Sequence, residues 1–122
     1  MTLSETALAF ARECLGWRDA KVLSHEPDAE SPRLVVMSAR AKADTLFAAT
    51  DLKDVEATVR AWCTAHGLDY AVKAGSGHQP ATATVTRPRP AGEPARLSSV
   101  SDPDPCRALM AACVEAQRKL RA

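Results

Sequence analysis

The apolar residues at the start of the chain recur with the period of an α-helix. Between positions 3 and 14 they fall on one helical face. The residues on this face are Leu3, Ala7, Phe10 and Cys14. Thr2 and Glu5 have the spacing of a capping box, in which each side chain hydrogen-bonds the backbone of the other residue. This pattern predicts a helix that starts after Thr2 and stops at Gly16.

The same period predicts two further helices. The second starts at Thr50 or Asp51 and ends at His66 and Gly67. Its apolar stripe consists of Leu52, Val55, Val59, Trp62 and Cys63. The last helix starts in residues 102–105 (DPDP), because aspartate caps helices and proline suits their first turn. Its apolar stripe consists of Cys106, Leu109, Met110, Cys113, Val114 and Leu120.

Three short segments between these two helices are typical of strands. They are residues 69–74, 81–86 and 95–100, and the second alternates alanine or valine with threonine. The loop GSGHQP joins the first two, and the proline-rich RPRPAGEP joins the last two. A glycine-rich phosphate cradle needs a strand that leads into a helix, whereas two strands flank GSGHQP. We therefore interpret this loop as a hairpin connection and expect antiparallel pairing.

The region between the first two helices has a weaker pattern. Residues 17–32 mix charged residues with few apolar ones, which predicts a short extended piece followed by an exposed loop. Residues 33–39 favour a strand, whereas residues 42–49 are apolar without a clear period. The pattern leaves open whether the apolar residues 34–37 pair within a sheet or form a dimer edge. Residues 17–49 are therefore treated as a variable insert.

These elements together predict an α+β fold in a single domain that spans residues 1–122. Their order needs a small antiparallel sheet covered by helices. A chain of 122 residues buries a sizeable core without disulfides or a metal. No apolar run approaches the roughly 18 residues of a membrane helix, and the first residues lack the basic start of a secretory signal. We therefore expect a protein of the reducing cytoplasm with no membrane association.

The titratable residues form no recognisable catalytic or metal-binding pattern. His25, His66 and His78 lack the spacing of metal ligands, and we interpret them as solvent-facing or helix-capping residues. The four cysteines lie on apolar stripes, where a buried thiol stays protonated. Only Cys106 occupies a helix first turn, where the helix dipole lowers a thiol pKa. The sequence therefore predicts no enzymatic activity, no cofactor and no metal.

Two charged segments are candidate surfaces for a partner. The connection at residues 87–94 combines proline, which limits the entropy lost on binding, with arginine, which anchors interfaces. The SHEPDAE stretch forms an acidic loop that lacks the calcium-loop pattern. The candidate partner-binding residues are Arg87, Arg89, Glu93 and Arg96 around the connection, and Glu26, Asp28 and Glu30 in the acidic loop. A net charge of +1 is too small to attract nucleic acid to the molecule as a whole.

Three segments of the chain resemble a known family. LAFARECLGWRDAKV, FAATDLKDVEATVRAWC and DPDPCRALMAACVEA resemble, in the same order and spacing, the phage αβα-sandwich domain family of small tailed-phage and prophage proteins. The resemblance implies a three-layer αβα sandwich, with a small antiparallel sheet of about three to four strands covered by three helices. It also implies a viral or prophage origin and attaches no catalytic residues. The chain departs from the family in its longer 87–94 connection and in residues 33–49.

These observations lead to competing functional hypotheses. The first is a phage accessory protein that binds a host or phage protein in the bacterial cytoplasm, for example to inhibit a host defence complex as anti-CRISPR proteins do. The second is a double-stranded RNA binding module in residues 51–122, whose element order matches that module. Asp102 and Asp104 oppose it, because they stand where such modules place phosphate-binding lysines.

Two further hypotheses have less support from the residues. The chain is an orphan structural protein of a phage if it has no dedicated partner. An enzyme would require an unrecognised site, such as Cys106 paired across space with His25 or His78. The sequence also leaves a homodimer open.

Overall fold

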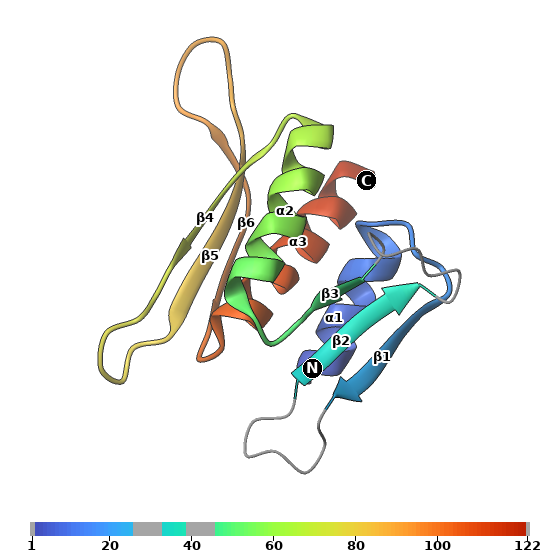
Figure 1. The fold of residues 1–122 in the computed structure, drawn as a ribbon. Helices are drawn as coiled ribbons and strands as arrows, with labels where there is room; N and C mark the ends of the chain where they lie inside the picture. Colours follow the sequence, from blue (N-terminus) through green and yellow to red (C-terminus); the bar gives the residue numbers. More distant parts are fainter. Residues whose placement is uncertain (1, 26–32, 39–45, 122) are drawn as a thin grey trace.

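The computed structural model of the protein describes residues 2–25, 33–38 and 46–121 (Figure 1). Its helices are α1 (Leu3–Glu13), α2 (Leu52–His66) and α3 (Pro105–Arg121). Its strands are β1 (Ala20–His25), β2 (Arg33–Ser38), β3 (Leu46–Ala48), β4 (Asp69–Lys73), β5 (Ala81–Arg87) and β6 (Ala95–Asp102). The three predicted helices are confirmed, as are the strands expected in the second half of the chain. Within the described ranges no helix is long and apolar enough to cross a bilayer.

The capping residues identified in the sequence set the helix boundaries. The Thr2 hydroxyl accepts a hydrogen bond from the backbone N–H of Glu5 at 3.1 Å, and the Glu5 carboxylate accepts one from that hydroxyl at 3.0 Å. Asp51 caps α2 through a backbone N–H at 3.1 Å, and Asp104 caps α3 in the same way at 2.9 Å. Gly67 ends α2 with a φ of 64°, a left-handed conformation that glycine adopts without strain.

The strands form two antiparallel sheets of three strands each, in the orders β1-β2-β3 and β4-β5-β6. Because α2 separates the two groups along the chain, each group pairs with its own sequence neighbours. The apolar residues 34–37 belong to β2, the central strand of the first sheet, where Val36 pairs with both Val22 and Phe47. This run therefore pairs within a sheet and does not form an edge. The connection GSGHQP joins two antiparallel strands, which confirms the predicted hairpin.

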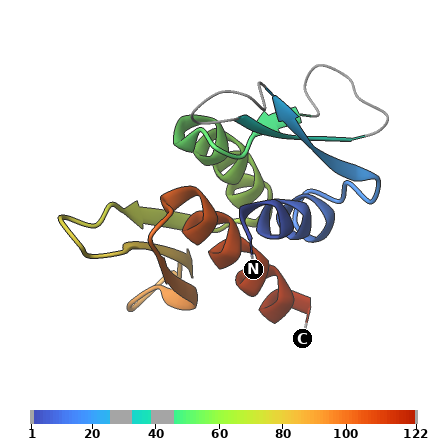
Figure 2. The same cartoon turned by 90° about the horizontal axis from the view of Figure 1, so that it is seen from below.

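The three helices lie between the two sheets (Figures 1 and 2). Helix α1 packs on β1 and β2, whereas α3 packs on β5 and β6. Helix α2 contacts β3 and β4, and both α1 and α2 pack against α3. The α+β class, the antiparallel pairing and the three covering helices are confirmed. The strands divide between two sheets where one was expected, so the helices cover the inner face of each sheet.

The core is centred on α3 and on an aromatic cluster next to α1. Leu109 and Met110 of α3 are fully buried. The ring of Phe47 in β3 meets the ring of Phe10 edge to face, with centroids 5.8 Å apart, and ties the first sheet to α1. The buried Ser98 hydroxyl donates a hydrogen bond of 2.7 Å to the carbonyl oxygen of Ala112, which holds β6 on α3. The position of β6 on α3 defines one wall of the groove described below.

Candidate binding surfaces

The hairpin between β5 and β6 carries the arginines predicted to contact a partner. Its loop projects beyond the ends of the helices (Figure 1). The four predicted residues Arg87, Arg89, Glu93 and Arg96 are all exposed. Among the described residues, none of the four has a side-chain hydrogen bond or an ion pair. The hairpin therefore offers three positive charges and one negative charge that the fold itself does not use.

The strand register decides how these charges are arranged. Arg87 pairs with Ala95, and Arg96 pairs with Thr86 in the adjacent position of the ladder. Because adjacent positions of a strand face opposite sides, Arg87 and Arg96 project from opposite faces of the hairpin. A register shift between Val85 and Thr86 precedes the tip. Positive charge therefore flanks the tip on both faces.

The remaining predicted residues do not assemble into a site within the described ranges. Outside those ranges lie the acidic-loop residues Glu26, Asp28 and Glu30. His66 ends α2, and its Nδ1 lies 2.9 Å from the carbonyl oxygen of Trp62, which confirms its interpretation as a helix-end residue. In the described part of the chain, no group of three His, Cys, Asp or Glu side chains is placed to hold a metal ion.

The cysteines are held as protonated thiols by their surroundings. All four are free, and Cys63, Cys106 and Cys113 are buried. Burial raises the pKa of Cys63 to about 11 and that of Cys14 to about 12. The pKa of Cys106 is also raised to about 11, first by burial and then by the carboxylate of Asp104. The pKa of Cys106 is therefore raised rather than lowered, and burial is the largest cause.

The first sheet has an apolar outer face that the sequence pattern did not reveal. On the side away from the helices, two cross-strand rows are Lys21–Met37–Leu46 and Leu23–Val35–Ala48. Leu23 and Leu46 are 50% and 47% exposed, and they are the large exposed hydrophobic residues of the described chain. The alternation of side chains in β1 could have indicated this face, but β3 is too short to show a period.

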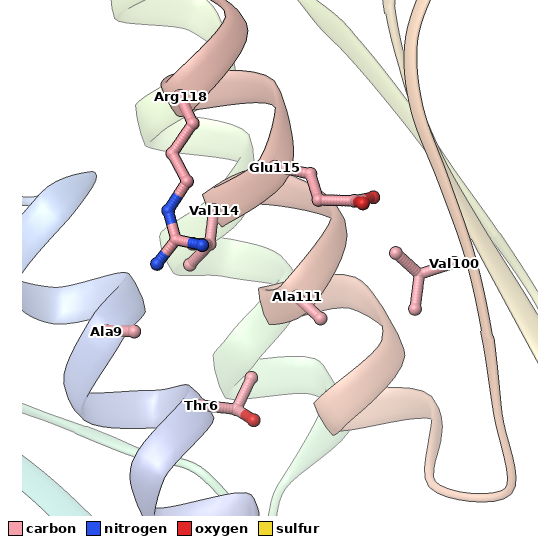
Figure 3. Close-up of a pocket in the computed structure, with 7 residues that line it drawn as sticks. All are labelled: Thr6, Ala9, Val100, Ala111, Val114, Glu115 and Arg118. Atoms are coloured by element: carbon pink, nitrogen blue, oxygen red, sulfur yellow. The ribbon is translucent and has the colours of Figure 1, made fainter. Parts of the chain in front are cut away.

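A groove of about 240 Å³ runs over α3 between α1 and β6 (Figure 3). Within the described chain, α1 and β6 both pack on α3 and do not contact each other. The residues that line the groove are Thr6 and Ala9 from α1, Val100 from β6, and Ala111, Val114, Glu115 and Arg118 from α3. Most of the lining is apolar, and alanines at two positions leave it open. Sequence reasoning missed this groove because its walls are distant along the chain.

One side of the groove is closed by an ion pair between α1 and α3. The Arg118 guanidinium donates two hydrogen bonds, of 2.9 and 3.0 Å, to the Glu13 carboxylate. Arg121 donates a further bond of 2.9 Å to the Glu13 carbonyl oxygen at the end of α1. The hydrogen bond from Arg118 lowers the pKa of Glu13 below its ordinary value. The charge of Arg118 is therefore already compensated inside the molecule.

The Glu13–Arg118 pair predicts a specific loss of stability in acid. Because the folded-state pKa of Glu13 is lowered, its stabilising contribution is complete above the ordinary value of 4.5 and disappears as the pH falls through the lowered pKa. At neutral pH, Glu13→Gln should cost less than about 1 kcal/mol, since the pair is partly exposed. The difference in Tm between wild type and variant should close as the pH approaches 3. A constant difference across this pH range would contradict the prediction.

Because comparison with known proteins found no match, a functional proposal must rest on these surfaces. No family model matches the chain, and neither a curated protein nor a solved structure matches it. The described surface features are the charged hairpin, the apolar outer face of the first sheet and the groove over α3.

Proposed function

We propose that the chain is a small phage or prophage accessory protein that acts by binding a host or phage protein. The observation that carries the proposal is the projecting β5–β6 hairpin, whose three arginines are exposed and have no partner among the described residues. Arginine is enriched at the energetic centres of protein interfaces. The prolines at positions 88, 90 and 94 restrict the loop and reduce the entropy lost on binding.

The charge of the hairpin defines the chemistry of the partner. Arg87 and Arg96 face opposite sides, so an acidic partner surface would enclose the tip from both faces. Occlusion of a host defence complex in the bacterial cytoplasm is one form of this function. The phage origin is supported by the residues that resemble the phage αβα-sandwich family.

A double-stranded RNA binding module is the second candidate. The observation that favours it is the order α2, β4, β5, β6, α3, with both helices on one face of the second sheet. The start of α3 opposes it. Asp104 caps the helix, and Asp102 forms an ion pair of 2.9 Å with Arg107. A phosphate backbone at this position would meet carboxylates, so a protein partner is favoured.

Charge reversal at the hairpin tests the proposal. The double variant Arg87→Glu/Arg89→Glu should lose at least about tenfold in affinity for the captured partner, since loss of one anchoring interaction of about 1.4 kcal/mol has that effect. The double variant Lys53→Glu/Lys73→Glu makes the same change in net charge on exposed positions away from the hairpin. Partner recovery should be measured by quantitative mass spectrometry after affinity capture. Equal losses in the two variants would assign binding to net charge and contradict the proposed site.

A further inference from the structure

The groove over α3 lies beside an unpaired strand edge, and this combination points to an occupant. We propose that an extended strand of a partner protein adds to the outer edge of β6 and places one apolar and one basic side chain against α3. The proposal rests on the proposed function only in that the partner is a protein. It names a contact site that is separate from the hairpin arginines.

The backbone of β6 is available for pairing. Strand β6 has eight residues and stands at the edge of the second sheet, where it pairs with β5 alone. Within the described chain, no backbone hydrogen bond links its outer edge to another element. Residues 97–101 (LSSVS) contain no proline and no charged residue. Proline and charged residues are the usual means by which an edge strand is kept from pairing. An extended peptide is the ligand whose backbone matches such an edge.

The floor of the groove matches the spacing of a strand. Ala111 and Glu115 lie one helical turn apart, which separates them by about 6 Å along the axis of α3. Side chains on one face of a strand repeat about every 6.7 Å. A strand beside β6 would therefore place two successive inward side chains over Ala111 and Glu115. Figure 3 shows Glu115 and Val100 on the same side of α3, with Ala111 facing the space between them.

The residues that line the groove determine which two side chains of the partner strand fit there. Val100 and Ala111 leave an apolar space that an aliphatic side chain fills. Glu115 is exposed and has no hydrogen bond or ion pair with the described residues, whereas Arg118 is bound by Glu13. Glu115 therefore lines the groove with a carboxylate that no side chain hydrogen-bonds, and Arg118 interacts with it only through space. A lysine or arginine of the partner strand complements this carboxylate.

The direction of the chain sets the order of these two residues. Strand β6 and α3 are joined by a short turn and run in opposite directions (Figure 1). An added strand that is antiparallel to β6, the more stable pairing, runs in the same direction as α3. It meets Ala111 before Glu115, so the expected motif is an apolar residue, any residue, then lysine or arginine. A helical occupant would leave the β6 edge unpaired.

Two synthetic peptides test the proposal. The first is Thr-Val-Thr-Leu-Thr-Lys-Thr-Val, and the second has glutamate in place of lysine. Titration of the isotope-labelled full chain, followed by NMR, should shift resonances of β6 and of residues 107–118. The lysine peptide should bind at least about tenfold more tightly, the ratio given by roughly 1.4 kcal/mol of charge discrimination. Glu115→Lys should reverse this preference.

A groove-filling variant and two controls complete the experiment. Ala111→Trp should weaken both peptides, whereas Ala61→Trp, at an exposed position of α2, should bind as wild type does. The Arg87→Glu/Arg89→Glu protein should also bind the lysine peptide normally, so failure at the groove and failure at the hairpin are distinguishable. The proposal is overturned if neither peptide shifts β6 at millimolar concentration, or if Ala111→Trp and Glu115→Lys bind both peptides as wild type does.

Discussion

The Phe47→Ala variant should lose about 3 to 5 kcal/mol of unfolding free energy, the range for removal of a buried aromatic ring. Phe47 is fully buried, and its ring contacts Phe10 at 5.8 Å and Trp17 at 5.9 Å between centroids. The variant therefore opens a cavity between the first sheet and α1. Because small domains are stable by only about 5 to 15 kcal/mol, this loss brings the fold close to unfolding.

Leu46→Ala is the matched control for this experiment. Leu46 is the neighbouring residue of β3, but it faces away from the helices and is 47% exposed. Its truncation should cost less than about 1 kcal/mol, since about half of the residue is already exposed to solvent. Urea unfolding can be followed through the fluorescence of Trp17, which lies against Phe47, together with that of Trp62. Equal losses for the two variants would mean that Phe47 does not hold the first sheet on α1.

The native thiols should react with iodoacetamide at least about a hundredfold more slowly than the thiols of the unfolded chain. The pKa of Cys63 and that of Cys106 are raised from 9.0 to about 11 by burial, and two units reduce the thiolate fraction about a hundredfold. The effect at Cys14, with a pKa of about 12, should be larger still. Burial also blocks access to the reagent, so these ratios are lower limits.

Peptide mapping of the alkylated protein measures the reactivity of each thiol separately. The experiment should compare native protein with protein in urea at the same pH, near 8. Cys106 is the informative position, because its place in the first turn of α3 would otherwise favour the thiolate. A native Cys106 that reacts as fast as in urea would contradict its burial and favour the enzyme hypothesis.

The helices could be predicted because their signals are local. The capping box of Thr2 and Glu5, the cap Asp51 and the stop at Gly67 each act within a few residues, and each is found where the sequence placed it. The alternation of alanine and valine with threonine likewise identified β5. In these segments the local preference and the tertiary packing agree, so the pattern is sufficient.

The first sheet could not be predicted as a separate sheet because its third strand is very short. Strand β3 contains three residues, which is too few for a period to appear. Its strand character comes from pairing with β2 and from the burial of Phe47 against α1. The second of these contacts joins segments that are distant in the sequence. The expectation of a single sheet followed from this missing element.

Some features of the candidate surfaces could likewise be predicted from the sequence, whereas others could not. Arginine and proline in residues 87–94 identified the hairpin from composition alone, but only the register places Arg87 and Arg96 on opposite faces. The groove lies between α1 and β6, which are far apart in sequence and both pack on α3. Small residues at Ala9 and Ala111 were the available signal, and alanine in a helix is too common to identify a groove.

Strand β6 connects the two surfaces. Arg96 lies near its start beside the hairpin, and Val100 lines the groove four residues later, about 13 Å along the strand. A partner strand that pairs with β6 and runs antiparallel to it would approach the hairpin at its far end. If both proposed contacts form, one partner protein would engage the charged tip and the apolar groove together, and each contact would raise the effective concentration for the other.

Affinity capture of the tagged protein from a bacterial lysate, with and without nuclease, tests the central claim of a protein-binding function most directly. We expect a stoichiometric protein partner, identified by mass spectrometry, whose recovery is unchanged by nuclease and reduced by the Arg87→Glu/Arg89→Glu substitutions. Recovery of nucleic acid alone, lost at moderate salt, would contradict the account and support the double-stranded RNA module of residues 51–122.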